Sequence, residues 1–328
     1  MNYIFKNIIL IVVFINFILT SCIKEIPIQV HKEGDLNLVQ IEMGGDYDNQ
    51  LFYSLSNNDV VSQNLETEWD IAFECNNEGS HIILNSATSG AVCKTNVFDF
   101  DSINSLNGNE NWKYDAPNGN LDSTAFGDYS NGHLYILNRG ISVSQGGNNL
   151  GYKKIMVKTI SSNQYEIRYA DLNGNNDTTL IINKDTNFNF LAFSFTKHST
   201  DYIFPPKQNW DILFTAYTHV FNDLNPPLPY RVSGVILNRE NTSVALDTNN
   251  NFSNIDYDMA TLYEYNYEID AIGYDWKNYS FSTSSYTVDS YKTFIIKTNI
   301  GFYYKLRFID FYNDNGDKGS PKFELQQL

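Results

Sequence analysis

The sequence is poor in basic residues and carries no familiar catalytic motif. Lys and Arg together number 22 against 38 Asp and Glu, which gives a formal net charge of −16. A chain this acidic repels phosphate backbones, so we expect no nucleic-acid partner. The motifs G-x-S-x-G and H-E-x-x-H, the P-loop and the dinucleotide fingerprint do not occur in it. We therefore expect that the protein is not an enzyme.

Cysteine is also scarce, and the first of three cysteines follows a short apolar segment. Residues 8–19 are apolar apart from Asn16, but a transmembrane helix needs about 20 such residues. Leu19-Thr20-Ser21-Cys22 resembles a bacterial lipobox, in which the cysteine is lipidated and becomes the mature N-terminus. The sequence thus predicts a lipoprotein signal peptide over residues 1–21 and attachment of a lipid such as palmitate at Cys22.

The residues after Cys22 indicate where such a lipoprotein is located. Lys24-Glu25 is similar to the short signals that send some Gram-negative lipoproteins to the outer cell surface. Residues 22–37 are polar and irregular, which is typical of a tether. We expect a lipid-anchored protein of the outer membrane that is exposed at the cell surface and does not span the bilayer.

The two other cysteines, Cys75 and Cys93, allow two interpretations. Disulfides persist in exported proteins, and the two residues flank short predicted strands, so a bridge between them is reasonable. Two buried free thiols are the alternative, since a chain of this size does not need a disulfide to stabilise its core.

Blocks rich in Ala and Leu are missing, whereas aromatic residues make up 15% of the chain. Aromatic and β-branched residues favour strands. Apolar and polar residues alternate over 155–160, 165–169 and 302–311, a pattern typical of half-buried antiparallel strands. Further strands are expected at 38–41, 51–55, 81–84, 91–93, 134–137, 178–182, 188–195, 230–237 and 294–296, and a short helix at 255–264. The sequence predicts an all-β fold of antiparallel sheets with at most one or two short helices.

One pentapeptide, W-D-I-x-F, occurs twice, at residues 69–73 and 210–214. Side chains alternate in a strand, so Trp69, Ile71 and Phe73 are expected on one face, as are the matching residues of the second copy. Such apolar faces indicate core strands rather than a binding site. Phe52 and Phe193 each lie 17 residues before a Trp, and Trp-Lys recurs at residues 112–113 and 276–277. We expect one domain over residues 38–328 with an internal repeat of 38–150 and 151–328.

The two W-D-I-x-F copies, together with residues 230–238 (YRVSGVILN) and 302–312 (FYYKLRFIDFY), resemble the HmuY-like family of surface lipoproteins. The likeness extends over most of residues 38–328. It implies an all-β HmuY-like architecture. It also implies haem binding between loops or strands near one end, with two axial side chains on the iron, and transfer of haem to an outer-membrane receptor.

The chain has five histidines, and haem iron needs a nitrogen or sulfur donor beside an apolar cleft. His219 is the best candidate because Tyr217, Phe221 and a Pro-rich loop adjoin it, and His198 is the second. His31 is expected in the tether. His81 and His133 are more typical of surface or turn positions. Met156 and Met259 are alternative ligands held in reserve, although methionines in such positions are more typical of core packing.

An oxygen-rich loop over residues 171–177 hints at calcium, but it lacks the terminal Glu of an EF-hand, so a β-turn is the better interpretation. No metal beyond haem iron is expected. The leading hypothesis is therefore a surface-anchored lipoprotein that captures haem for uptake. The alternative is a non-catalytic surface module that binds glycan or protein without haem.

Overall fold

The computed structural model describes residues 31–144 and 146–328, so the predicted signal peptide and Cys22 lie outside the described residues. Glu33–Leu328 forms a single unit. The fold begins before the end of the tether predicted over residues 22–37, because Gly34 N donates to Gln327 O at 2.9 Å. Within the described ranges, none of the helices has both the length and the apolar character needed to cross a bilayer.

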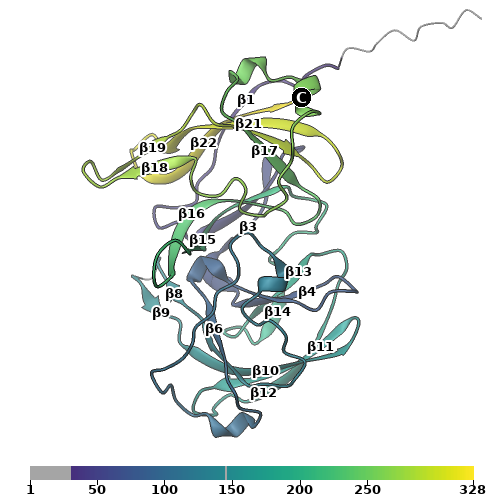
Figure 1. The fold of residues 1–328 in the computed structure, drawn as a ribbon, viewed down its shortest axis with the longest axis vertical. Coiled ribbons are helices and arrows are strands. Elements are labelled where there is room, and N and C mark those ends of the chain that lie inside the picture. The colour runs from purple at the N-terminus through teal and green to yellow at the C-terminus, as the bar shows by residue number, and fades with distance from the viewer. Residues whose placement is uncertain (1–30, 145) are drawn as a thin grey trace, which may run out of the picture. The chain divides into compact units, whose positions relative to one another are not determined.

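Four antiparallel sheets, here named A to D, hold most of the described chain (Figure 1). Sheet A has the order β1 (Asn37–Gln40), β22 (Lys318–Gln327), β21 (Tyr303–Tyr312), β20 (Thr293–Lys297), β17 (Ser243–Asp247). Sheet B has the order β16 (Leu228–Leu237), β15 (Ile212–Phe221), β2 (Asn49–Ser54), β3 (Asp59–Leu65). Sheet C has the order β14 (Ser199–Asp201), β13 (Phe190–Ser194), β4 (Ile71–Glu74), β5 (Ile82–Leu84). Sheet D has the order β12 (Thr178–Asn183), β11 (Gln164–Asp171), β10 (Tyr152–Ser161), β7 (Tyr135–Asn138), β6 (Ala91–Lys94).

Short elements complete the fold, and the all-β prediction is confirmed. Two small hairpins pair β8 (Ile141–Ser142) with β9 (Asn148–Asn149) and β18 (Lys277–Ser280) with β19 (Ser285–Val288). The helix expected over residues 255–264 is present but shorter: α2 is Tyr257–Ala260, and the Asp256 side chain caps it by accepting from Met259 N. Single 3-10 turns are η1 (Glu66–Glu68), η2 (Ser86–Thr88), η3 (Phe100–Ser102), η4 (Leu121–Ser123) and η5 (Phe252–Asn254).

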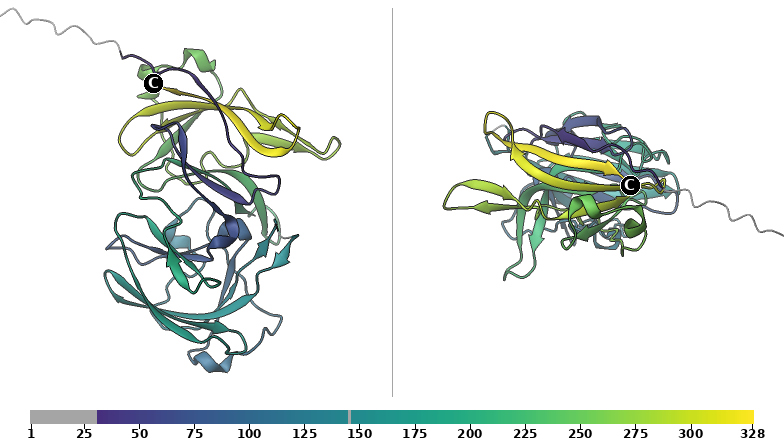
Figure 2. Two further views of the ribbon diagram at one scale, coloured as in Figure 1. Left: turned by 180° about the vertical axis from the view of Figure 1, so that it is seen from behind. Right: turned by 90° about the horizontal axis from the view of Figure 1, so that it is seen from above.

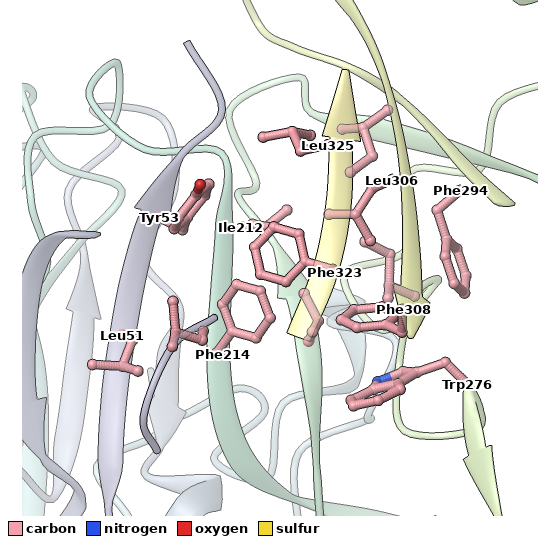
Figure 3. Close-up of a cluster of buried hydrophobic side chains, with 14 of the residues drawn as sticks. Leu51, Tyr53, Ile212, Phe214, Trp276, Phe294, Leu306, Phe308, Phe323 and Leu325 are labelled. Carbon is pink, nitrogen blue, oxygen red and sulfur yellow. The ribbon is translucent and has the colours of Figure 1, made fainter. Parts of the chain in front are cut away.

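The sheets stack in the order A, B, C, D, with apolar clusters between neighbours, and the view from behind shows the same order (Figure 2). Between A and B, Phe214 stacks on Phe323 with ring centroids 5.5 Å apart, and Phe308 closes the cluster (Figure 3). Between C and D, Phe73 packs on Tyr165 at 5.1 Å. Each fully buried ring of this kind contributes about 1.5–3 kcal/mol by leaving water, so these two layers hold the outer sheets in place.

Sheets B and C are two versions of one arrangement, made by exchanging hairpins. The hairpin β2–β3 precedes the first W-D-I-x-F but pairs with β15, which follows Trp210. The hairpin β13–β14 pairs with β4 instead. Asn85 and Asn238 occupy matching positions after β5 and β16, since each side chain donates to the carbonyl of its own Trp at 2.7 Å. The duplicated plan is thus interlocked rather than divided.

The strand pairings place the repeat boundary between β12 and β13, not at residues 150 and 151. Strands β6 and β7 share sheet D with β10, β11 and β12, so a cut at residue 150 would divide one sheet. The two Trp-Lys dipeptides, at residues 112–113 and 276–277, also do not occupy equivalent positions in the two halves. Lys113 bridges Val92 in the first half, and the matching bridge in the second half joins Asn266 to Val244, not Lys277.

The prediction that Trp, Ile and Phe of each W-D-I-x-F share one face is wrong. Ile71 and Phe73 pack toward sheet D, whereas Trp69 packs on the opposite face with Ala72. The regular strands begin only at Ile71 and Ile212, so the alternation does not reach back to either Trp. The upstream match is also shifted by one residue, because Asp70 N donates to Phe193 O and Asp211 N to Tyr53 O rather than to Phe52.

The disulfide expected between Cys75 and Cys93 is not formed, and both residues are buried free thiols. The physical reason is their placement. Cys75 follows β4 of sheet C and packs in the cluster between C and D, whereas Cys93 lies in β6 of sheet D and its Sγ is turned to its own neighbour, Lys94 O. The loop after Asp171 is a turn as predicted, with Gly174 N donating to Asp171 O at 2.9 Å.

Candidate functional site

The candidate site centres on His219, near the end of β15. Tyr217, His219 and Phe221 alternate along this strand and therefore share one face. The His219 ring makes edge contacts with Phe221 at 4.8 Å and with Tyr274 at 5.2 Å between centroids. Its Nδ1 atom is buried without a hydrogen-bond partner among the described residues. The structure thus confirms the aromatic surroundings expected from the sequence and adds Tyr274, which is distant in the chain.

The segment carrying Tyr274 approaches β15 and β16 closely because of two glycines. Val235 of β16 and Gly273 exchange two backbone hydrogen bonds, and a Cβ on the neighbouring Gly234 would lie 2.3 Å from Gly273 O. Any larger residue at Gly234 would push this segment away from His219. The same segment brings Asp270 near, and burial raises the pKa of that carboxyl while His219 acts on it electrostatically in the opposite direction.

The arm formed by the outer parts of β15 and β16 is fixed to the first half of the chain by one arginine. Arg231 donates to Glu66 Oε2 at 2.6 Å and to Ala87 O at 2.7 Å. Glu66 is fully buried, and desolvation raises its pKa while Arg231 lowers it. Thr218 adds a bond to Ser86 O at 2.8 Å. A buried, hydrogen-bonded charge pair holds its geometry tightly, so the strand that presents His219 is rigidly positioned.

Apolar side chains are exposed on the arm around His219. Tyr230 pairs with His219 across the two strands and is 59% exposed. Leu224 and Leu228, in and after the connecting loop, are each 46% exposed. Exposed apolar groups gathered beside a nitrogen donor are what a flat apolar ligand with a metal would require.

His198 lies elsewhere. It sits in the turn between β13 and β14, exposed, with its Nδ1 2.9 Å from Tyr169 Oη, and its ring stacks on that tyrosine. Its contacts share no residue with those of His219, so the structure does not bring the two candidates together. A ligand that used both as an axial pair is not supported.

The reserve candidates lie in different surroundings. His81 Nδ1 lies 2.5 Å from Glu74 Oε2. His133 packs on Phe98 at 4.5 Å, and its Nδ1, like that of His219, is buried without a hydrogen-bond partner among the described residues, but it has one aromatic neighbour where His219 has two. Met156 and Met259 pack at the edges of small apolar clusters. His31 is exposed. No group of three or more His, Cys, Asp or Glu residues within 31–144 and 146–328 could hold a metal ion.

Sequence reasoning missed a cavity between sheets B and C. Its volume is about 110 Å³, and both W-D-I-x-F tryptophans line it together with three phenylalanines, Phe52, Phe190 and Phe204. Asp115 and Arg239 line it from flanking loops. Burial raises the pKa of Asp115 to about 6, although Leu84 N and Ala125 N both donate to its carboxylate, and burial lowers the pKa of Arg239 to about 10. This cavity was not predicted from the sequence because the two tryptophans were expected on the same strand face as the Ile and Phe of each motif.

Comparison with known proteins gives the family. The model of the HmuY protein family matches residues 46–325, most of the chain. The chain belongs to the HmuY family. A search of curated proteins finds no match to this HmuY family member.

Solved structures similar to this HmuY family member include three from different bacteria. They are a putative HmuY-like heme binding protein of Bacteroides vulgatus (12% identity, 88% of this chain and 90% of that chain covered, TM-score 0.23), apo PinO of Porphyromonas gingivitis (11%, 90% and 97%, 0.28) and the apo HmuY analog TFO of Tannerella forsythia (8%, 92% and 99%, 0.28). The family assignment rests on the family model alone.

Proposed function

We propose that this HmuY family member is a lipoprotein of the outer cell surface that captures haem through His219. The observation that carries the proposal is the His219 ring, which makes no hydrogen bond with any described residue and stands between Phe221 and Tyr274. An imidazole left out of the protein's own hydrogen bonding is free to bind a metal. Haem, when bound, would supply an iron that accepts a nitrogen donor such as the imidazole of His219.

The residues present fit one axial ligand. A histidine that binds metal through one nitrogen usually donates its other N–H to an acceptor, which fixes the ring orientation. Nδ1 of His219 is buried without a hydrogen-bond partner among the described residues, and Asp270 is a carboxylate that interacts with His219 electrostatically. Asp270 would be the acceptor for Nδ1–H if the ring came to donate to it on binding, which would leave Nε2 for the iron. Exposed Leu224, Leu228 and Tyr230 would cover the apolar faces of the macrocycle.

Purified residues 23–328 titrated with haemin test this proposal. We expect a saturable, red-shifted Soret band that is lost or strongly weakened in His219→Ala. His198→Ala and His133→Ala serve as matched controls that remove an imidazole elsewhere, and both should keep the shift. Circular dichroism should show that all variants are folded. A spectrum that stays that of free haemin, or an unchanged Soret shift in His219→Ala, would overturn the proposal.

The membrane part of the proposal rests on the lipobox-like residues 19–22 alone, and delivery of haem to an outer-membrane receptor is proposed from the resemblance to the HmuY-like family. No catalytic role is proposed.

A polar cavity favours the second candidate function, glycan binding without haem. Its volume is about 510 Å³, and it is lined by polar side chains with one tyrosine, including Ser80, His81, Asp122, Asp128, Tyr129 and Lys158. Hydroxyl-rich ligands suit such a lining. Retention on a glycan array that falls in Asp128→Ala, with no Soret shift, would favour this candidate over haem capture.

A further inference from the structure

The two halves of the interlocked repeat differ at one hydrogen bond beside the cavity between sheets B and C. Trp69 Nε1 donates across the interface to Gln50 Oε1 at 2.8 Å. Trp210 occupies the matching position in the second copy and is 8% exposed, yet its Nε1 is buried without a partner. A buried indole N–H usually finds an acceptor, so this one is an unpaired polar group on a residue that lines a largely aromatic cavity.

The repeat itself explains why the partner is missing. Tyr53 and Phe193 are equivalent, because they accept from Asp211 N and Asp70 N respectively. Counting back three residues in each strand makes Gln50 equivalent to Phe190. Both residues line the cavity, but a phenylalanine has no amide oxygen to accept from Trp210. The second half therefore leaves an unpaired donor on a residue that lines the cavity, where the first half closes its own hydrogen bond.

Three of the other polar side chains around the cavity are already engaged. Gln50 Nε2 donates to Thr215 Oγ1 at 2.9 Å, Thr215 Oγ1 donates to Ala216 O, and the Asp115 carboxylate accepts two backbone N–H groups. The walls are aromatic, with Phe52 and Trp210 edge to face at 5.0 Å and Trp69 and Phe204 at 5.1 Å. Half-buried residues such as Ile83 and Pro117 line its rim, so the cavity reaches the surface.

We infer that this cavity is a second binding site, which takes a small planar aromatic molecule carrying one hydrogen-bond acceptor. The acceptor bonds Trp210 Nε1, and the ring lies among Phe52, Phe190 and Phe204. The volume of about 110 Å³ suits a single ring, since an apolar cavity of roughly 150 Å³ holds one benzene. Leu213, Thr215 and Tyr217 of β15 line this cavity and His219, the next residue on the same face of the strand, does not, so the proposed haem ligand and the Trp210 donor are different side chains that can be tested separately.

Pyridine and benzene form a matched pair of probes, because they have the same shape and only pyridine has an acceptor. We would titrate each into ¹⁵N-labelled residues 23–328 and follow the four indole N–H resonances, with that of Trp210 assigned from Trp210→Phe. Pyridine should move the Trp210 resonance downfield and saturate. It should bind roughly fivefold more tightly than benzene, the gain expected from one net hydrogen bond.

Two variants test the donor, and one tests its independence from haem. Trp210→Phe keeps an aromatic wall and Phe190→Gln supplies an internal acceptor, and each should abolish the preference for pyridine. Trp69→Phe removes a paired N–H and should keep it. His219→Ala should keep the pyridine response while losing haemin. Equal affinity for the two probes, or no saturable shift with either, as when a water molecule alone occupies the cavity, would overturn the inference.

Discussion

The two W-D-I-x-F aspartates, Asp70 and Asp211, allow a stability prediction in which the same substitution is compared at two equivalent positions of one protein. Asp70 accepts from Arg139 Nε at 2.7 Å, from Arg139 Nη2 at 3.3 Å and from Phe195 N at 2.7 Å. Asp211, at the matching position, accepts from Leu55 N at 2.8 Å and has no cation partner. Both aspartates are buried, at 4% and 6% exposed. Replacing each by asparagine removes the same charge from two different surroundings.

The expected magnitudes follow from those surroundings. Asp70→Asn leaves the guanidinium of Arg139, whose side chain is 11% exposed, without its carboxylate partner, which costs up to about 3–5 kcal/mol of unfolding free energy. Burial raises the pKa of Asp211 from 3.8 to about 6, so its ionised form costs the fold about 3 kcal/mol at pH 7. Asp211→Asn removes that cost and keeps an acceptor for Leu55 N, but it buries a new NH₂ group at about 1–3 kcal/mol. We expect that variant to be between unchanged and about 2 kcal/mol more stable.

Urea denaturation followed by tryptophan fluorescence, at pH 4 and at pH 7, measures both effects. A carboxyl whose folded pKa is raised favours the fold at low pH, and this contribution is lost as pH rises from about 4 to 6. Asp115 contributes in the same direction, so Asp211→Asn should reduce the pH dependence in this window without removing it. Equal losses in the two variants, or a pH dependence untouched by Asp211→Asn, would refute the reasoning.

Three further predictions use other buried or reactive groups. Lys277 is buried among Trp276, Tyr286 and Phe311 and donates only to Ser233 O among the described residues. Burial lowers its pKa to about 7, so its charged form destabilises the fold, and wild-type stability should rise from pH 7 toward 10 as this lysine loses its proton. Lys277→Met should raise the urea midpoint at pH 7 by the equivalent of about 1–3 kcal/mol and flatten that rise, and a loss of stability would contradict this. Burial raises the pKa of the Cys75 and Cys93 thiols, so a thiol reagent should label neither of them in the native Cys22→Ser protein. After denaturation without reductant it should label both, whereas a native disulfide would leave no thiol to be labelled. Cys22→Ala should abolish incorporation of labelled palmitate and membrane association in the producing cell, whereas retained label would exclude Cys22 as the lipid site.

Strands with strong local alternation could be predicted from sequence, and those without it could not. β10, β11 and β21 were expected within a few residues of their observed ends because their apolar and polar residues alternate. β3 was missed, since its DVVSQNL sequence is largely polar and it lies at the edge of sheet B, where a strand needs little apolar surface. β17 and β22 were missed as well. β17 pairs with the distant β20, and β22 pairs with the distant β1 as well as with its neighbour β21, so their position in sheet A depends in part on tertiary contacts.

The surroundings of His219 were predicted only as far as local sequence reached. Tyr217 and Phe221 lie on its own strand and were expected beside it. Tyr274 reaches it through the close approach of Gly234 and Gly273, which no local pattern encodes. The exchange of hairpins is equally hidden, because either hairpin satisfies the alternation of either W-D-I-x-F strand, and only the packed structure selects the distant one.

Both proposed sites lie where the repeat is broken, and this follows from what a repeat does. Symmetric positions such as Asn85 and Asn238 bond alike because they maintain the same framework twice. β4 and β5 are four and three residues long, whereas their counterparts β15 and β16 are each ten, and His219 lies on the additional length. Phe190 stands where a second glutamine would accept from Trp210 Nε1, so this hydrogen bond is missing in the second half. This is a second difference between the halves. One half of a duplicated framework can maintain the fold while the other half carries a histidine and an indole that make no hydrogen bond with the protein. Differences between the halves therefore indicate function more directly than the shared motif does.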